Sequence, residues 1–320
     1  MKQRKPTSRR TPARGLRQWV QLVWTALTNG YLKGYAEGRI YTGKSKLLCV
    51  PGLNCYSCPG ALGSCPIGAL QATLGSRHYK FTFYVLGFLL VTGAALGRFV
   101  CGWLCPVGLV QDLLWRIPVF QSWRKKHKCL PGEKLLRALR WAVLGVLCIL
   151  LPLIAVDVVG NGKPWFCAYL CPAGTLGAGI PLMLLNESLR SAAGWLFSWK
   201  ALVLGILLFA SLLLWRPFCR YLCPLGAVYG CFNRTALARY EVDPAACTGC
   251  GACKAACPLD IPVWQTPNSM DCVRCGKCKA ICPEKAIHWH RPFSAVGADR
   301  SSAEPSVQSL SDDRKENDCE

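Results

Sequence analysis

The sequence predicts an α-helical membrane protein that ends in a small, cysteine-rich α+β domain. Hydrophobic residues make up 52% of the 320 positions, and the mean hydropathy is +0.24. Long uncharged stretches alternate with dense clusters of Lys and Arg, a pattern typical of membrane spans flanked by basic loops. The 22 cysteines fall largely into C-x2-C and C-x3-C-P clusters, which is the spacing of thiolate metal ligands.

The formal net charge of +21 raises the question of a nucleic-acid partner. The basic residues lie beside apolar segments and not along a soluble face. We therefore expect membrane lipid, through its anionic headgroups, to be the partner of these charges, and we expect no nucleic acid. A disulfide scaffold is also a poor fit, because dense disulfides belong to short secreted chains.

Both ends of the chain are expected to be disordered. Residues 1–18 form a basic cytoplasmic arm that lacks the early apolar core and cleavage site of a signal peptide, and no such core follows the pair Arg9–Arg10. Residues 293–320 are rich in Ser, Asp and Glu and cannot bury enough apolar surface to offset the ordering entropy. We interpret Cys319 in this tail as an incidental thiol.

The membrane domain is expected to cover residues 19–240 and to contain about four transmembrane helices. The first expected span is diluted by polar residues, and the last is interrupted only by Lys200, which can reach the interface or line a cavity. In order, the spans are Trp19 to about Tyr35, Phe81 to Gly97, Trp141 to about Val159, and Trp195 to Trp215.

Two further stretches, residues 47–76 and 164–185, are uncharged but rich in Gly and Pro. Non-helical backbone at membrane depth is stable only when protein covers it, so we interpret both as re-entrant or interfacial segments on the outer side. Positive charge is densest in the N-terminal arm, in residues 116–140 and after Arg216. The positive-inside rule then predicts a multi-pass protein with both termini in the cytoplasm.

Residues 241–292 carry a repeated four-cysteine motif. Cys247-x2-Cys250-x2-Cys253-x3-Cys257-Pro is followed by a second run of the same spacing that begins at Cys272. This spacing is that of bacterial two-cluster ferredoxins, in which the fourth cysteine of each run ligates the other cluster. It predicts one [4Fe-4S] cluster on Cys247, Cys250, Cys253 and Cys282, and a second on Cys257, Cys272, Cys275 and Cys278.

The alternative for this domain is a pair of zinc knuckles, since C-x2-C pairs also hold zinc. Two identical four-cysteine runs that each end in Cys-Pro favour clusters instead. Gly249, Gly251 and Gly276 are expected to let backbone amides approach the sulfurs. The fold class predicted for the whole chain is thus a helical membrane protein with a C-terminal two-cluster ferredoxin domain.

The membrane domain contains an internal repeat of the form Cys-Pro-x-Gly. Two copies match over a longer stretch, residues 98–106 and 216–224, which indicates a duplicated membrane unit. The repeat occurs at Cys65, Cys105, Cys171 and Cys223. The prolines after three of these cysteines, Pro106, Pro172 and Pro224, are each expected to start a helix whose positive dipole end favours thiolate or cluster charge.

Pairs of cysteines at i and i+4 suggest two further metal sites, because such pairs project from one face of a helical turn. The topology predicts an inner, cytoplasmic site formed by Cys101, Cys105, Cys219 and Cys223. It predicts an outer site from among Cys49, Cys55, Cys58, Cys65, Cys167 and Cys171, which are more thiols than one cluster needs. Outer disulfides or simple helix packing remain alternatives for these cysteines. Cys129, Cys148 and Cys231 fit no pattern, and packing is expected for Cys148.

Haem and nucleotide cofactors are not expected. The four histidines, His78, His127, His288 and His290, lie outside the expected spans, and no C-x2-C-H motif occurs. His78 is interpreted as an interfacial residue. The Gly-rich stretches lack the strand–helix context of a dinucleotide site. We therefore expect an electron-carrying subunit rather than a self-contained enzyme, and no catalytic residue is assigned.

The four spans, the C-x3-C-P motifs and the double-cluster ferredoxin together resemble the NapH/MauN-type membrane polyferredoxins, which are related to FixG and NosR. The segment from Cys49 to Ala69 is similar to a subgroup of bacterial 4Fe-4S binding proteins. The resemblance covers about Trp19 to His290. It implies transfer of electrons from the quinol pool to a redox partner protein. The motif Cys167–Cys171 adds a third C-x3-C-P to the two associated with NapH.

The expected function is iron–sulfur electron transfer in the bacterial cytoplasmic membrane, between a quinol or cytoplasmic donor and a redox partner protein. The cofactors are two [4Fe-4S] clusters, with one or two further clusters or metal sites in the membrane domain. The alternatives are an assembly factor that reduces or handles a metal such as copper, since soft thiolates suit Cu(I), and a redox-sensing regulator.

Overall fold

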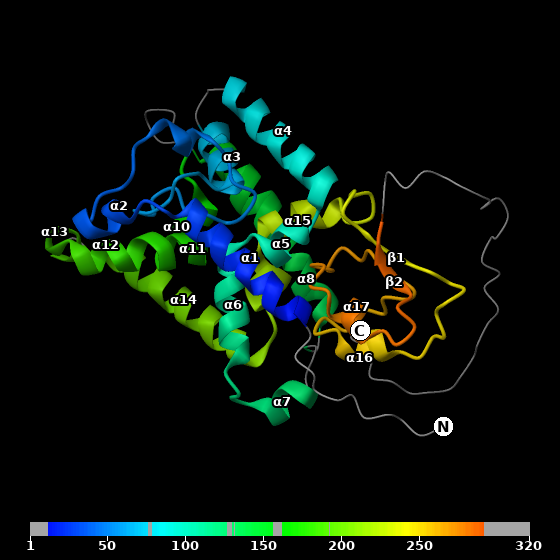
Figure 1. Cartoon of the computed structure of the whole chain (residues 1–320). Helices are drawn as coiled ribbons and strands as arrows, with labels where there is room; N and C mark the ends of the chain where they lie inside the picture. Colours follow the sequence, from blue (N-terminus) through cyan, green and yellow to red (C-terminus); the bar gives the residue numbers. More distant parts are fainter. Residues whose placement is uncertain are drawn as a thin grey trace.

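The computed structural model describes residues 12–75, 79–126, 130, 132–155, 162–191 and 193–290. Within them, a largely helical body is followed by a small C-terminal domain that packs against one end of it (Figure 1). Most of the predicted basic arm, the predicted tail, Cys129, His78 and His127 lie outside the described residues.

The first part of the body consists of α-helices and one short 3-10 turn, η1. Its elements are α1 (Pro12–Thr28), α2 (Leu32–Glu37), η1 (Lys44–Leu47), α3 (Pro66–Gly75), α4 (Tyr79–Leu96), α5 (Phe99–Trp103), α6 (Pro106–Arg116) and α7 (Gln121–Lys126).

The second part of the body mixes α-helices with π-helical segments, which often occur at functional sites. The π-helical segments are η2, η3 and η4. The elements are α8 (Glu133–Ala142), η2 (Val143–Leu150), α9 (Leu151–Ile154), α10 (Trp165–Tyr169), α11 (Pro172–Gly174), η3 (Thr175–Gly179), α12 (Ile180–Leu185), α13 (Glu187–Ser191), α14 (Trp195–Leu213), η4 (Phe218–Leu222) and α15 (Pro224–Cys231).

Two helices of the described residues are long and apolar enough to cross a membrane. They are the rod Glu133–Ile154, formed by α8, η2 and α9, and α14 at Trp195–Leu213. They correspond to the third and fourth expected spans, although the third begins before Trp141. The apolar helices Phe83–Leu96 and Pro172–Leu185 are shorter. The body is therefore mostly helical with two candidate spans, against the four expected.

The first expected span, Trp19–Tyr35, is not one continuous helix. α1 ends at Thr28, and α2 begins only at Leu32. The Thr28 hydroxyl donates to the Trp24 carbonyl at 2.8 Å, a local bond that competes with the backbone ladder at the helix end. α1 also buries Arg17 and packs against α5 and α6, as an amphipathic helix does.

Each Cys-Pro repeat begins a helix, as predicted for Pro106, Pro172 and Pro224 and as found also at Pro66. The prolines Pro66, Pro106, Pro172 and Pro224 are the first residues of α3, α6, α11 and α15. Proline fits this position because its fixed φ is already helical and its missing N–H needs no partner there. The preceding cysteine consequently lies beside the free amides of the first turn.

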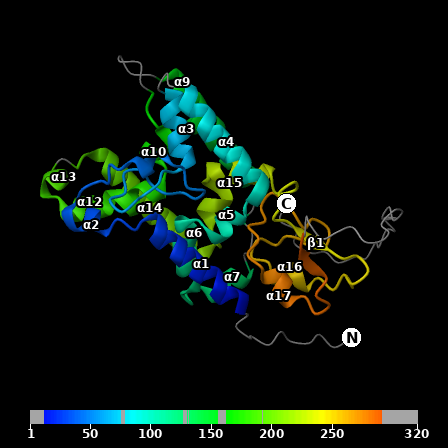
Figure 2. The same cartoon turned by 45° about the horizontal axis from the view of Figure 1, so that its top comes forward.

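The two Gly- and Pro-rich stretches pack against the helices and against each other. Residues 48–65 form an irregular loop with an isolated bridge between Cys49 and Ser64. Gly162 donates its N–H to the Gly75 carbonyl at 2.8 Å, and a Cβ on Gly75 would lie only 2.6 Å from Gly162 O. This close backbone approach requires glycine. Figure 2 shows α3, α4 and α9 grouped on this side of the body.

The C-terminal domain is a small α+β unit, as predicted. Its strands β1 (Tyr240–Val242) and β2 (Ile287–Trp289) pair antiparallel, with Tyr240 opposite Trp289. The short helices α16 (Ala252–Ala256) and α17 (Lys277–Ile281) each lie within one of the two cysteine runs.

Buried ion pairs join this domain to the body. Asp271 accepts hydrogen bonds from Arg98 at 3.4 Å, from Arg137 at 2.7 Å, and from Arg140. Burial raises the pKa of Asp271, but the three arginines outweigh burial and hold this pKa below its ordinary value. Asp271 is therefore a charged anchor between the domain and helices α5 and α8.

The variant Asp271→Asn should weaken this docking. Removal of one partner from a buried charge cluster typically costs about 3–5 kcal/mol, because the arginines stay buried without compensation. We expect a lower thermal unfolding midpoint and faster limited proteolysis of the C-terminal domain. The control Glu241→Gln changes an acid of the same domain that is 45% exposed, and it should alter stability by no more than about 1 kcal/mol. Equal effects of the two variants would contradict an anchoring role.

Candidate iron–sulfur sites

Two cavities in the C-terminal domain, cavity I and cavity II, are each lined by four cysteines. They enclose about 410 and about 350 Å³ of atom-free space, part of it open to solvent. In each case the fourth cysteine of one run joins the cavity of the other run, which is the grouping that cross-ligation requires. Cavity I has Cys247, Cys250, Cys253 and Cys282, and cavity II has Cys257, Cys272, Cys275 and Cys278.

Glycines shape the backbone around these cavities. Gly249, Gly251 and Gly276 have φ values of +64°, +70° and +80°, a conformation that L side chains rarely adopt. Gly251 and Gly276 are the N-cap residues of α16 and α17. The chain can therefore turn sharply within each cysteine run.

The donor set of these cavities suits iron–sulfur cubes. Among the described residues, no three His, Cys, Asp or Glu side chains are arranged to hold a single metal ion. The thiols stand around open space instead, as the ligands of a multi-atom cluster do. Burial raises the pKa of Cys272 to about 12, so a bound metal has to displace the thiol proton.

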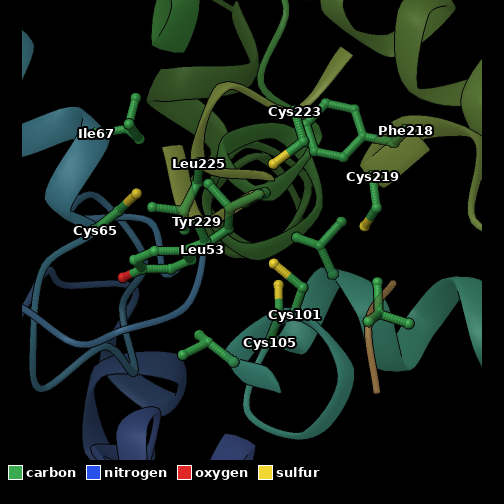
Figure 3. Packing of buried hydrophobic residues seen from close by; sticks show 14 of the residues in the cluster. Leu53, Cys65, Ile67, Cys101, Cys105, Phe218, Cys219, Cys223, Leu225 and Tyr229 are labelled. Carbon is green, nitrogen blue, oxygen red and sulfur yellow. The ribbon is translucent and has the colours of Figure 1, made fainter. Parts of the chain in front are cut away.

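The body brings the predicted inner cysteines together, and we call Cys101, Cys105, Cys219 and Cys223 the inner quartet. Cys101 lies in α5 and Cys219 in η4, while Cys105 and Cys223 are the N-cap residues of α6 and α15. All four are at most 5% exposed. The pair Cys101 and Cys105 forms one arm of the quartet, and the pair Cys219 and Cys223 forms the other. Figure 3 shows the two arms facing each other.

Two buried arginines cross between these arms. Arg98, just before Cys101 in the chain, donates to the Cys219 carbonyl at 2.8 Å. Arg216, just before Cys219, donates to the Cys101 carbonyl at 2.6 Å. Both arginines are 1% exposed. Each therefore holds the opposite arm and places positive charge beside the thiols.

The carboxylate that pairs with Arg216 was not anticipated from the sequence. Asp112 accepts two bonds from Arg216, at 2.9 and 2.5 Å, and one from Arg17 at 2.8 Å. Burial raises the pKa of Asp112, but these arginines outweigh burial and keep it below its ordinary value. Arg220, the residue after Cys219, pairs with Glu133 at 2.5 Å.

Each Cys-Pro-x-Gly repeat directs a backbone amide at its own cysteine. The Gly226 N–H donates to Cys223 Sγ at 3.4 Å. In the other three copies the glycine three residues after the cysteine also places its backbone amide near the sulfur, at Cys65, Cys105 and Cys171. Such N–H···S bonds favour thiolate and tune a bound cluster.

A second residue missed from the sequence, Gln111, ties the arms of the inner quartet. Its Oε1 accepts the Phe218 N–H at 3.2 Å, and its Nε2 lies 3.3 Å from Cys219 Sγ. Gln111 is six residues after Cys105, and Gln71 occupies the same position after Cys65. The repeated spacing was the signal in the sequence that could have identified Gln111 as a site residue.

Of the six candidate outer cysteines, four line a third cavity. It encloses about 1440 Å³ of atom-free space, part of it open to solvent. Cys49 does not line it and lies 4.0 Å from Ser64 Oγ, and Cys58 Sγ lies 3.0 Å from the Tyr35 hydroxyl. All six are free thiols. We call the four that line the cavity the outer quartet: Cys55, Cys65, Cys167 and Cys171.

The remaining described cysteines and histidines line none of the three cavities. Cys148 is fully buried within η2, as expected for a packing residue, and Cys231 is exposed. His288 lies in β2 opposite Glu241, and His290 Nδ1 is 2.6 Å from the same carboxylate.

A helical body that brings cysteine pairs together, joined to an α+β domain with two four-cysteine cavities, defines a ferredoxin-type protein. The comparisons with known proteins agree. One 4Fe-4S binding domain family matches residues 81–128, 141–181 and 195–239, and a second 4Fe-4S binding domain family matches residues 240–263. No solved structure matches the chain.

Curated relatives identify the family. The methylamine utilization ferredoxin-type protein MauN of Paracoccus denitrificans is 30% identical over 237 residues, which cover 73% of this chain and 71% of that protein. MauN of Methylobacillus flagellatus is 31% identical over 55% of this chain and 53% of its own length. The ferredoxin-type protein NapH of Haemophilus influenzae is 30% identical over 58% of this chain and 57% of its own. The chain thus spans about half the length of the latter two relatives. It belongs to the family of ferredoxin-type proteins that includes MauN and NapH.

Cross-ligation can be tested with one cysteine from each run. Cys282→Ala should remove the same EPR component of the reduced protein as Cys247→Ala, because both cysteines line cavity I. Each variant should lose up to about four irons per chain. Cys231→Ala removes an exposed thiol and serves as the matched control. It should change neither the EPR components nor the iron content. If Cys282→Ala instead removes the component lost in Cys272→Ala, the grouping is wrong.

Proposed function

We propose that the chain is an iron–sulfur electron-transfer subunit of the bacterial cytoplasmic membrane, linking its C-terminal domain through the inner quartet to a redox partner protein. The contact between cavity II and the inner quartet carries this proposal. Arg98 donates to the Met270 carbonyl at 2.9 Å, two residues before Cys272, and to the Cys219 carbonyl at 2.8 Å. One buried side chain therefore joins ligand-bearing segments of both sites.

Backbone contacts bring the same segments closer still. A Cβ on Gly102, the residue after Cys101, would lie 2.2 Å from the carbonyl oxygen of Val273, the residue after Cys272. The Trp103 indole N–H donates to the Arg274 carbonyl at 3.0 Å. Electron transfer slows steeply with distance, so this direct packing of the two cysteine segments supports exchange between them.

Bound in these sites, [4Fe-4S] clusters supply one-electron chemistry whose potential depends on charge, hydrogen bonds and burial. The residues of the chain set these conditions. Arg98 and Arg216 add positive charge beside the inner quartet, and the Gly226 amide donates to Cys223 Sγ. The low exposure of the quartet excludes water.

Apolar exposure supports the membrane location. Leu202, Ile206 and Phe209 follow one face of α14 at helical spacing and are 56%, 59% and 55% exposed. An apolar stripe of this kind suits contact with lipid acyl chains. We propose that both termini and the ferredoxin domain face the cytoplasm, and that quinol or quinone exchanges electrons with the chain, as the resemblance to NapH implies.

Electron flow can be measured directly in proteoliposomes. Dithionite outside would reduce the C-terminal clusters, and ferricyanide trapped inside would accept the electrons. We expect ferricyanide bleaching with the wild-type chain and a fall to background with Cys101→Ala/Cys219→Ala, while Cys231→Ala retains full flow. Wild-type protein that bleaches no faster than empty liposomes, or that binds copper at these cysteines, would overturn the proposal.

Orientation can be tested with a membrane-impermeant amine reagent. Lys279 and Lys285 are exposed on the ferredoxin domain, and Lys44 is exposed between the first and second expected spans, a connection that the proposed topology places outside. Lys279 and Lys285 should react only in inverted vesicles, and Lys44 only in intact spheroplasts. The reverse labelling pattern would show that the proposed orientation is wrong.

A further inference from the structure

We infer that the outer quartet, Cys55, Cys65, Cys167 and Cys171, holds a further iron–sulfur cluster in a site built on the same plan as the inner quartet. This inference extends the proposed relay by one centre and so rests on the proposed function. The 4Fe-4S family match at residues 141–181 includes Cys167 and Cys171 but excludes Cys55 and Cys65. The case for all four therefore comes from geometry.

Gln71 does in the outer quartet what Gln111 does in the inner one. Its Oε1 accepts the Phe166 N–H at 3.1 Å, and its Nε2 lies 3.6 Å from Cys167 Sγ. The corresponding distances at Gln111 are 3.2 and 3.3 Å. Gln71 is fully buried. A buried amide aimed at a cysteine in both copies indicates a duplicated ligand site and not ordinary packing.

Lys200 supplies at the outer quartet the positive charge that the arginines supply at the inner quartet. Its Nζ donates to the Cys167 carbonyl at 3.2 Å, as Arg216 donates to Cys101 O and Arg98 to Cys219 O. Lys200 lies within the apolar helix α14, where a charged side chain is costly. The negative charge of four thiolates around a cluster would compensate this lysine.

The position of Cys55 completes the set of four. A Cβ on Gly174 would lie 3.6 Å from Cys55 Sγ and 3.6 Å from Lys200 Nζ, so Cys55 faces the Cys171 arm. A Cβ on Gly68 would lie 3.7 Å from Cys167 Sγ, so the Cys65 arm faces the same space. Cys55 thus supplies the thiol that Cys101 supplies in the inner quartet.

The two quartets are neighbours. The backbone amide of Leu53 lies near Cys105 of the inner quartet, and the next amide, that of Asn54, lies near Cys65 of the outer quartet. Tyr229, which is fully buried, donates its hydroxyl to Pro51 of the same loop at 3.1 Å. Figure 3 shows Leu53 and Tyr229 in the region between Cys65 and the inner cysteines. A cluster in the outer quartet would therefore be separated from the inner site by a single layer of packed residues.

The test measures iron, sulfide and other metals in full-length protein purified anaerobically in detergent. Wild type should hold about 16 irons per chain, and both Cys55→Ala/Cys65→Ala and Cys167→Ala/Cys171→Ala should lose about four. The matched double variant Cys49→Ala/Cys58→Ala removes two thiols from the same loop but none that lines the cavity, so it should keep all the iron. Retained EPR signals of the C-terminal clusters show that each variant is folded.

The outcomes separate this inference from the proposed function. Wild type with about 12 irons, outer variants with unchanged iron, or equal losses in Cys49→Ala/Cys58→Ala would overturn the outer site and leave the relay through the inner quartet intact. About eight irons, unchanged in Cys101→Ala/Cys219→Ala, would remove the inner site as well. Zinc or copper in the outer quartet would also overturn the inference.

Lys200→Met gives a readout that does not depend on ligand loss. With iron unchanged, loss of the positive charge should shift one cluster to a lower reduction potential in a redox titration. Lys44→Met, which removes an exposed lysine, should leave every potential unchanged. Identical potentials in Lys200→Met and wild type would overturn the role given to Lys200.

Discussion

Negative charge held between apolar helices has to be compensated, and this requirement organises the centre of the protein. Thiolates and a cluster cannot leave water without nearby cations and hydrogen-bond donors. Arg98 and Arg216 meet the requirement from inside the fold, and Asp271 and Asp112 fix them in place. The arginine network consequently determines how α5, α6 and η4 meet, and it extends to the docking of the C-terminal domain.

The same network packs the C-terminal domain directly against the segments that carry the inner quartet. Arg98 contacts the ferredoxin segment and the Cys219 carbonyl at once, and Arg274 donates to the Leu96 carbonyl at 2.7 Å and to the Asn233 carbonyl at 2.7 Å. A flexible tether would let the distance between cavity II and the inner quartet vary. Buried polar contacts hold that distance fixed, which is what an electron relay needs of its scaffold.

Duplication would explain how the proposed outer site arose at little structural cost. A Cys-Pro start, a glycine amide at the sulfur and a glutamine across to the other arm recur in both quartets. The cation differs, since a lysine from α14 replaces an arginine next to the cysteine pair. The irregular loop around Cys55 replaces the helical turn of Cys101, which is why the outer site does not show the simple i, i+4 pattern on both arms.

The local features of the sites could be predicted from the sequence. The spacing of the cysteine runs, the prolines that start α3, α6, α11 and α15, and the glycines with positive φ each depend on neighbours a few residues away. Long-range partners were not readable in this way. The ion pairs of Asp112 with Arg216 and of Asp271 with its arginines join residues from distant segments. The same is true of the cavity that Cys55 lines and Cys49 and Cys58 do not. Only packing brings such residues together. The sequence by itself determined the kind of ligand and the local turns, because backbone geometry is set over short distances. The tertiary structure decided which thiols share a cavity and which charges balance them, because burial and contact belong to the folded chain.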